Sequence, residues 1–148
     1  MEFWIVVANQ TAARIFEAQS PSSALVEKRA LVHPASRLKE GDLVSDAPGT
    51  TYDRFGEGRH RSDPDSSQRD REMVVFATEI AAALREAVLR DGVGTLLLVA
   101  PATFLGVLRR RLDANTLQRV TLEVNKDLVR FDAWTIRSRL PEFLPRRR

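Results

Sequence analysis

Two apolar segments of strand length, residues 3–8 and 95–100, constrain the fold of this chain more than any other feature. The first reads Phe-Trp-Ile-Val-Val-Ala and the second Thr-Leu-Leu-Leu-Val-Ala. A strand that is apolar on both faces is buried on both faces, which is typical of the middle of a sheet beside a parallel neighbour. We therefore expect these two segments to pair in parallel at the centre of one sheet.

Three further segments predict the other strands. Residues 12–18 follow residues 3–8 after a short polar link, which favours an antiparallel hairpin. Residues 24–32 carry three successive charged side chains, and residues 119–125 alternate between apolar and polar side chains. Both patterns are typical of strands that face water on one side, so these two strands are expected at the periphery of the sheet.

Three helices are expected between and after these strands. A long amphipathic helix is predicted to begin at Asp63-Pro64, because Asp is a good N-cap and Pro fits the first turn. Gly92 is placed to end it. Shorter helices are predicted at residues 101–112 and 132–140.

The element order is therefore β-β-β-α-β-α-β-α, which indicates an α/β fold. The central and peripheral assignments predict a mixed five-stranded sheet in the order 3-2-1-4-5, counted along the chain, with helices on both faces. The right-handed crossover rule fixes the path through the long helix, and the topology is ribonuclease H-like. Residues 1–148 are expected to form a single domain, with a long loop at 33–64 and a disordered basic tail at 141–148.

Composition excludes several classes of protein. Cysteine is absent, which excludes disulfides, thiolate nucleophiles and thiolate metal sites. The first residues, MEFWIVV, lack the basic leader and long apolar stretch of a signal peptide, and no apolar run approaches the roughly 20 residues that span a bilayer. We expect a cytoplasmic protein without a membrane span.

The residues expected near the sheet do not assemble a known catalytic site. A ribonuclease H-type nuclease holds two metal ions with clustered carboxylates. Neither central strand contains a carboxylate, and Glu79 on the long helix would stand alone. The two histidines, His33 and His60, have no partners at metal-ligand spacing. The sequence therefore favours a protein without catalytic residues, metal ion or cofactor.

One candidate ligand site follows from the topology. Asn9 and Thr11 come after the first strand and Thr103 after the fourth, and ligands of open α/β sheets bind beyond such strand ends. The helix N-terminus there and Arg59 with His60, if the long loop folds across, would favour a small anion such as a phosphate. The same residues also fit structural roles as a turn, a helix cap and a loop anchor.

The charge is distributed unevenly along the chain. Residues 109–148 carry eleven Lys or Arg against five Asp or Glu, whereas residues 1–108 carry twelve against fifteen. Such asymmetry indicates an anionic partner, either RNA or an acidic protein surface. Arg109, Arg110, Arg111 and Lys126 are the candidate nucleic-acid contacts. The alternative is that these charges only solvate a helix face and a tail.

Several segments together resemble a known family. They include an Ala-Pro-x-x-x-Leu-Gly turn after the fourth strand, a Gly-Arg-His loop and a Lys-Asp-Leu segment, and they span almost the whole chain. On these motifs the chain resembles the bacterial host attachment protein family, described as proteins required for attachment to host cells. The matching segments are residues 4–18, 33–38, 45–60, 96–112 and 125–131.

The resemblance implies a small α/β domain similar to the central domain of archaeal and eukaryotic peptide-chain release factors and of Pelota-type rescue factors. This chain has Asn9 where the family commonly has Asp, and it lacks the Gly-Gly-Gln tripeptide of release factors. We therefore hypothesise a non-catalytic module that contacts RNA or a ribosomal, translation-related surface. The alternatives are a binder or enzyme for a small anionic ligand and a cell-surface adhesion factor. The oligomeric state is left open.

Overall fold

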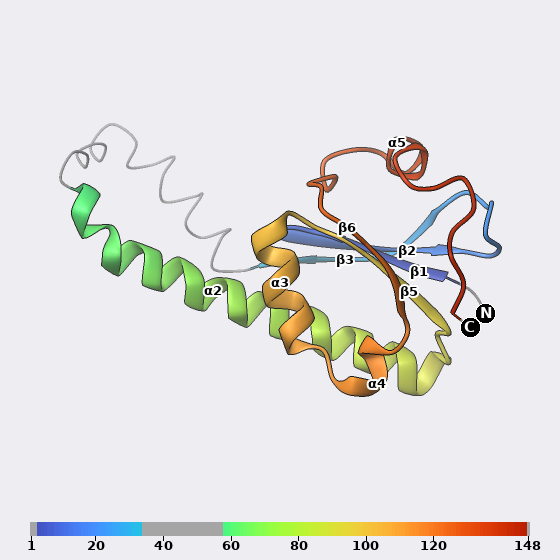
Figure 1. Cartoon of the computed structure of the whole chain (residues 1–148), viewed down its shortest axis with the longest axis horizontal. Helices are drawn as coiled ribbons and strands as arrows, with labels where there is room; N and C mark the ends of the chain where they lie inside the picture. Colours follow the sequence, from blue (N-terminus) through green and yellow to red (C-terminus); the bar gives the residue numbers. More distant parts are fainter. Residues whose placement is uncertain (1–2, 34–57, 148) are drawn as a thin grey trace.

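The computed structural model describes residues 3–33 and 58–147, and in the second stretch its side chains are described from Ser67 onward. Three strands come first along the chain, and helices and two further strands follow, as Figure 1 shows. The elements are β1 (Phe3–Ala8), β2 (Ala12–Ala18), β3 (Val26–Val32), α2 (Gly58–Glu86), the π-helix η1 (Ala87–Asp91), β5 (Thr95–Val99), α3 (Ala102–Arg111), α4 (Ala114–Leu117), β6 (Val120–Val124) and α5 (Ala133–Ser138).

The five strands form one mixed sheet in the order β3-β2-β1-β5-β6. β1 runs parallel to β5, with Ile5 opposite Leu97, and β5 runs parallel to β6. β2 pairs antiparallel with both β1 and β3. The predicted order 3-2-1-4-5 and the parallel pairing of the two apolar segments are therefore confirmed.

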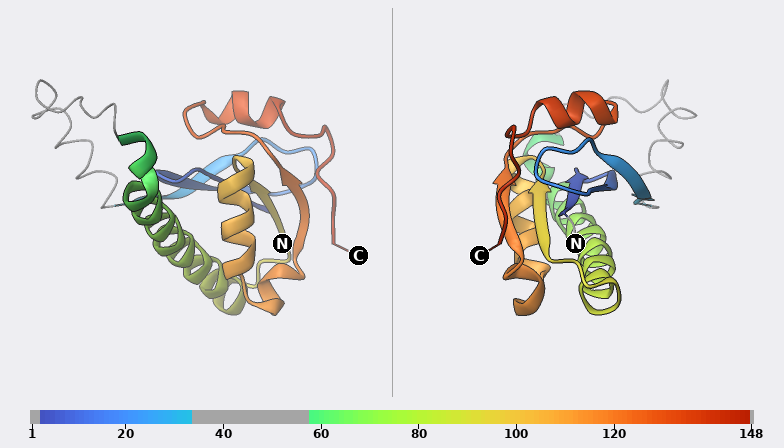
Figure 2. Two further views of the ribbon diagram at one scale, coloured as in Figure 1. Left: turned by 60° about the vertical axis from the view of Figure 1, so that its left-hand side comes forward. Right: turned by 90° about the vertical axis from the view of Figure 1, so that its right-hand side faces the viewer.

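Helices cover both faces of the sheet, as predicted. α2 and α3 lie on one face and α5 lies on the other, which Figure 2 shows from two directions. Alternate residues of the central strands supply the two cores. Val6 and Leu98 pack towards α2 and α3, whereas Ile5 and Leu97 pack towards α5, and all four are fully buried. This two-sided burial is the reason that β1 and β5 are apolar at nearly every position.

The long helix begins earlier than the capping signal indicated. α2 starts at Gly58, so Asp63 and Pro64 lie inside it and the predicted loop at 33–64 is too long at its carboxyl end. The run Gly58–Ser62 contains no proline or β-branched residue, and nothing in it prevents helical dihedrals. The rest of the predicted loop, residues 34–57, lies outside the described residues.

Gly92 ends the helical stretch as predicted. Its φ of 67° lies in the left-handed region that favours glycine, and its N–H donates to the carbonyl of Ala87. The four-residue helix α4 has no counterpart in the prediction, because one turn is too short to produce an apolar period.

The last described residues differ from the predicted disordered tail. The side chain of Leu144 is 2% exposed and belongs to the core beneath α5. Its N–H donates to the carbonyl of Pro21 at 2.9 Å, and the hydroxyl of Thr121 donates to the carbonyl of Pro145 at 2.8 Å. The three arginines at the end of the sequence suggested a solvated tail. Leu140 and Leu144, four positions apart, instead bury their side chains in the core and hold this segment against the sheet.

Across residues 3–33 and 58–147, no helix combines the length and the apolar character that crossing a bilayer requires.

Candidate functional site

The turn between β1 and β2 is organised by one side chain, Asn9. Its Oδ1 accepts hydrogen bonds from the N–H of Thr11 at 2.9 Å, from the hydroxyl of Thr11 at 2.9 Å and from the N–H of Ala12 at 3.0 Å. An Asn side chain that accepts from the backbone two residues later forms an Asx turn. Residues 9–11 therefore form the turn that the sequence analysis gave as their structural role.

Asn9 also joins this turn to the segment after β6. Its Nδ2 donates to the carboxylate of Asp127, at 3.2 Å from Oδ1 and 3.4 Å from Oδ2. The prediction missed Asp127, because its place depends on the register of β6. The carboxyl ends of β5 and β6 lie side by side, since the N–H of Ala100 donates to the carbonyl of Val124, and Asp127 follows directly.

These residues line a crevice of about 250 Å³ at the carboxyl ends of the central strands. The structure brings together Asn9, Thr11 and Thr103 there, as the topology predicted. α3 starts at the same place, and its N-cap, Pro101, forms no side-chain capping bond. The complete lining is Asn9, Gln10, Thr11, Pro101, Thr103, Phe104 and Asp127.

The side chains of Arg59 and His60 lie outside the described ones. Both residues belong to the first turn of α2, whose N-terminal end extends beyond the sheet in Figures 1 and 2. Phe76 is the α2 residue that packs near the crevice, with its ring centroid 6.0 Å from that of Phe104. His60 lies 16 residues before Phe76, about 24 Å along the helix at 1.5 Å per residue. The positive charge expected from these two residues at the crevice therefore stays a prediction.

A buried histidine that the prediction left aside lies close to the same turn. His33 is 3% exposed, its N–H donates to the carbonyl of Thr11 at 3.0 Å, and its ring centroid is 5.2 Å from that of Phe76. Both of its ring nitrogens lack a hydrogen-bond partner within the described part of the chain. Its position at the end of β3 makes it part of the packing behind the crevice.

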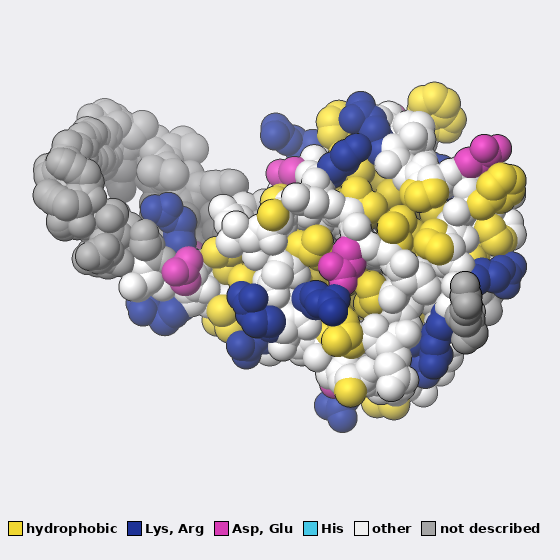
Figure 3. Space-filling model, in the orientation of Figure 1, with side chains coloured by type: hydrophobic (Ala, Val, Ile, Leu, Met, Phe, Trp, Pro, Cys, Tyr) yellow, Lys and Arg dark blue, Asp and Glu magenta, His cyan; other side chains and the backbone are white. Residues whose placement is uncertain are grey.

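The predicted nucleic-acid contacts fall into two separate places. Arg109, Arg110 and Arg111 form the last turn of α3. Lys126 follows β6, near the first turn of α3, and the ten residues of that helix span about 15 Å. Figure 3 shows Lys and Arg side chains in several groups over this face rather than in one continuous patch.

The crevice itself offers binding groups rather than a reaction centre. It provides one carboxylate, two amides, two hydroxyls and the N-terminus of α3. Within residues 3–33 and the described side chains from Ser67 onward, no three His, Asp or Glu side chains are grouped so that they could hold a metal ion. Asp127 adds negative charge to a site for which an anionic ligand was predicted.

Replacing Asn9 by Asp tests the link between the turn and Asp127. We expect Asn9→Asp to lower the free energy of unfolding by about 1–2 kcal/mol at pH 7, because it exchanges a hydrogen bond for two adjacent carboxylates. Protonation of the introduced carboxyl group removes the repulsion, so the loss shrinks as the pH falls through about 4. Urea denaturation at both pH values measures it.

Asn115→Asp is the matched control, since Asn115 is exposed and accepts a hydrogen bond from Arg119. Its unfolding free energy should differ little from that of the unaltered protein at either pH. A deficit of Asn9→Asp that stayed constant between pH 7 and pH 4 would show that Asp127 does not oppose the new carboxylate.

Comparison with known proteins relates the chain to a protein family and to a solved structure. Residues 4–140 match the model of a family whose description is "Protein required for attachment to host cells". No curated protein sequence matches the chain. Among solved structures, the archaeal translation termination factor aRF1 matches with a TM-score of 0.48 and 11% sequence identity, over 95% of this chain and 35% of that one. The chain thus spans about a third of the length of that factor.

Proposed function

Because the chain belongs to the family of proteins required for attachment to host cells, as its sequence motifs indicated, we propose that it acts as a non-catalytic binding module whose partner is RNA. In this proposal the protein is cytoplasmic and affects attachment indirectly. The basic residues after position 108 supply the contacts to the phosphate groups.

The observation that supports this proposal is that most of the described basic residues in the last quarter of the chain form no salt bridge with a carboxylate of the described residues. Among the described residues from 109 to 147, Arg109 is the one basic residue in a salt bridge with a carboxylate, that of Glu123. Arg110 and Arg111 are exposed at the end of α3. By contrast, the basic side chains of β2 and β3 include the pairs Arg14–Glu27 at 2.9 Å and Lys28–Glu17 at 3.4 Å.

An uncompensated group of guanidinium groups favours a polyanion over a neutral partner. Arginine matches phosphate geometry with two parallel hydrogen bonds and remains charged at all physiological pH values. Each phosphate that it neutralises releases a counterion, which makes RNA binding dependent on salt concentration. The proposal therefore predicts a measurable salt slope.

Removing the two unpaired arginines of α3 should reduce that slope. We expect Arg110→Gln/Arg111→Gln to weaken binding of a single-stranded RNA at low salt, and to lower the slope of log K against log salt by about 1.4, at ~0.7 per lost phosphate contact. Fluorescence anisotropy of a labelled oligonucleotide over a series of salt concentrations measures both quantities.

Arg90→Gln is the matched control, because Arg90 is also exposed but forms a salt bridge with Glu86 at the carboxyl end of α2. It should bind RNA with the slope of the unaltered protein. If the unaltered protein bound no RNA at low salt, or bound it with no salt dependence, the proposal would be wrong.

The two other hypotheses have less support. A small phosphate-containing ligand in the crevice would meet the carboxylate of Asp127, whose negative charge repels an anion. A direct adhesin would need a surface that recognises the host cell, and the basic residues after position 108 favour a polyanion instead.

A further inference from the structure

Exposed aromatic side chains of the described residues are concentrated around α5. Trp134 is 79% exposed, Phe143 is 64% exposed and Phe131 is 39% exposed. The other described phenylalanines, such as Phe16 and Phe104, are buried. A nearly free indole on a helix surface has no role in packing the core, and large exposed aromatic groups mark binding surfaces.

Positive charge lies next to these aromatic side chains. The guanidinium group of Arg139 lies over the ring of Phe131, 5.2 Å from its centroid. Arg130 precedes Phe131 and is exposed. Figure 3 shows blue and yellow side chains next to each other along the edge where α5 lies. From residue 126 to residue 147 the chain has six basic and three acidic residues, so this surface complements a polyanion.

Two carboxylates of this region already accept hydrogen bonds within the protein. Asp132 caps α5 by accepting a hydrogen bond from the N–H of Thr135 at 2.8 Å, and this bond lowers the pKa of Asp132. Asp127 accepts from Asn9 at 3.2 Å. The guanidinium group of Arg137 is also committed, because it donates to four backbone carbonyls. Among the described residues, Arg130 and Arg139 are exposed basic side chains close to α5 in the sequence, and neither donates a hydrogen bond to a carbonyl or carboxylate there.

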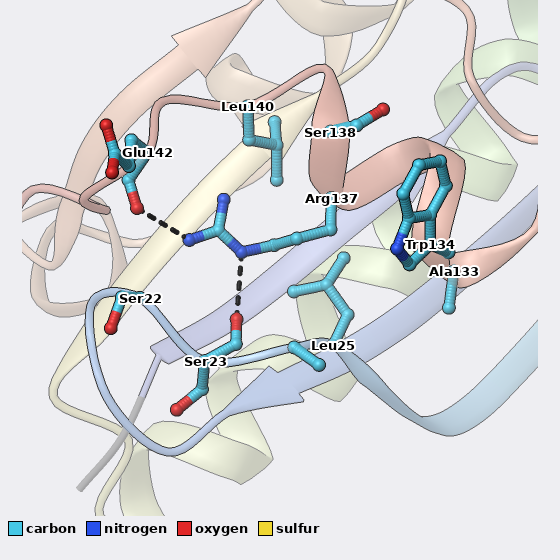
Figure 4. A pocket seen from close by; sticks show the side chains of 10 residues that line it. Ser22, Ser23, Leu25, Ala133, Trp134, Arg137, Ser138, Leu140 and Glu142 are labelled. Carbon is cyan, nitrogen blue, oxygen red and sulfur yellow. Dashed lines mark hydrogen bonds between the residues drawn. The ribbon is translucent and has the colours of Figure 1, made fainter.

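A groove of about 720 Å³ runs alongside the indole, between α5 and the turn from β2 to β3. Figure 4 shows Trp134 at one end and the guanidinium group of Arg137 pointing away from it, between Ser23 and Glu142. Leu25 and Leu140 contribute apolar surface to the groove. Its volume lies within the range of about 300–1,000 Å³ that small planar ligands occupy in proteins.

We propose that this α5 surface (Arg130, Phe131, Trp134 and Arg139) binds single-stranded RNA by stacking an unpaired base on the indole of Trp134. The inference rests on the proposed function and assigns to it a second surface, on the face of the sheet opposite α3. Stacking on an exposed aromatic ring is tolerant of base identity, and flanking guanidinium groups contact the phosphates. A duplex has no free base to stack, so this surface discriminates single strands from duplexes.

Fluorescence provides the test, because Trp4 and Trp134 are the two tryptophans of the chain. In a Trp4→Phe background, Trp134 is the sole tryptophan. We expect a twelve-nucleotide oligouridylate to quench its emission and a duplex of equal length to leave it almost unchanged. In the protein with Trp4 present, anisotropy of the labelled oligouridylate should show binding about tenfold weaker for Trp134→Ala, and closer to that of the unaltered protein for Trp134→Phe.

Leu89→Ala is the matched control, since Leu89 is 64% exposed on η1, away from α5. It should leave the affinity unchanged. If Trp134→Ala bound within twofold of the unaltered protein while Arg110→Gln/Arg111→Gln bound more weakly, the inference would be overturned and the proposed function would stand. Absence of any RNA binding at low salt overturns both. A protein partner that requires Trp134, without quenching by RNA, overturns the inference in favour of a protein-binding surface.

Discussion

Replacing Leu98 by alanine is expected to lower the free energy of unfolding by about 2–5 kcal/mol, the range for a truncated leucine in a closed core. Leu98 is fully buried in the central strand β5 and packs in the core beneath α2 and α3. The neighbouring strands are held by backbone hydrogen bonds on both sides, so the sheet cannot collapse into the cavity. Such a loss is a large part of the roughly 5–15 kcal/mol that stabilises a domain.

Urea denaturation followed by circular dichroism measures this loss. Leu89→Ala is again the control, because an exposed leucine contributes little and its removal should change the stability by no more than about 0.5 kcal/mol. If Leu98→Ala unfolded at the same urea concentration as Leu89→Ala, the central position of β5 would be wrong.

Replacing Arg137 by methionine is expected to cost about 2–4 kcal/mol, because it removes a charged donor from four carbonyl groups at once. Nε donates to Ser23 at 2.8 Å, Nη1 to Pro141 at 2.8 Å, and Nη2 to Pro21 and Glu142 at 2.9 Å each. Arg137 therefore joins α5, the β2–β3 turn and the last segment of the chain. The partial exposure of the side chain keeps the expected loss below the sum of four separate bonds.

Two measurements separate this role from a general loss of packing. Arg137→Lys retains the charge but not the planar fork, so it should recover less than half of the stability. Amide exchange at Leu144 should accelerate in Arg137→Met, since the N–H of Leu144 donates to the carbonyl of Pro21 in the same cluster. Arg139→Met, with no carbonyl partners among the described residues, should leave that exchange unchanged. Equal effects of the two methionine variants would contradict this assignment.

The sequence predicted the sheet well because its signals are local and consistent. Residues apolar at every position, as in β1 and β5, have one stable environment, the middle of a two-sided sheet. The three-residue link at Asn9–Thr11 leaves little choice but a hairpin. The start of the last helix at residue 132 was also predicted, because the N-cap that begins it there, Asp132, depends on residues only three positions apart.

The candidate site was predictable only in part. Asn9, Thr11 and Thr103 follow central strands, and the parallel pairing of β1 and β5 carries them to one crevice. Asp127 depends on the register of β6, which its own pattern does not determine. Arg59 and His60 were assigned to the crevice on the assumption that the chain around them folds back, whereas they belong to the first turn of α2.

By itself the sequence determined which segments lie inside and in what order they pair, since burial of apolar side chains depends on residue type and local spacing. The tertiary structure alone decided which distant polar groups meet. Asn9 and Asp127 are hydrogen-bonded although they are 118 residues apart in the sequence. Arg137 and Ser23 are likewise joined across 114 residues. Their contacts follow from strand register and from the packing of α5, which are collective properties of the folded chain that no local pattern encodes.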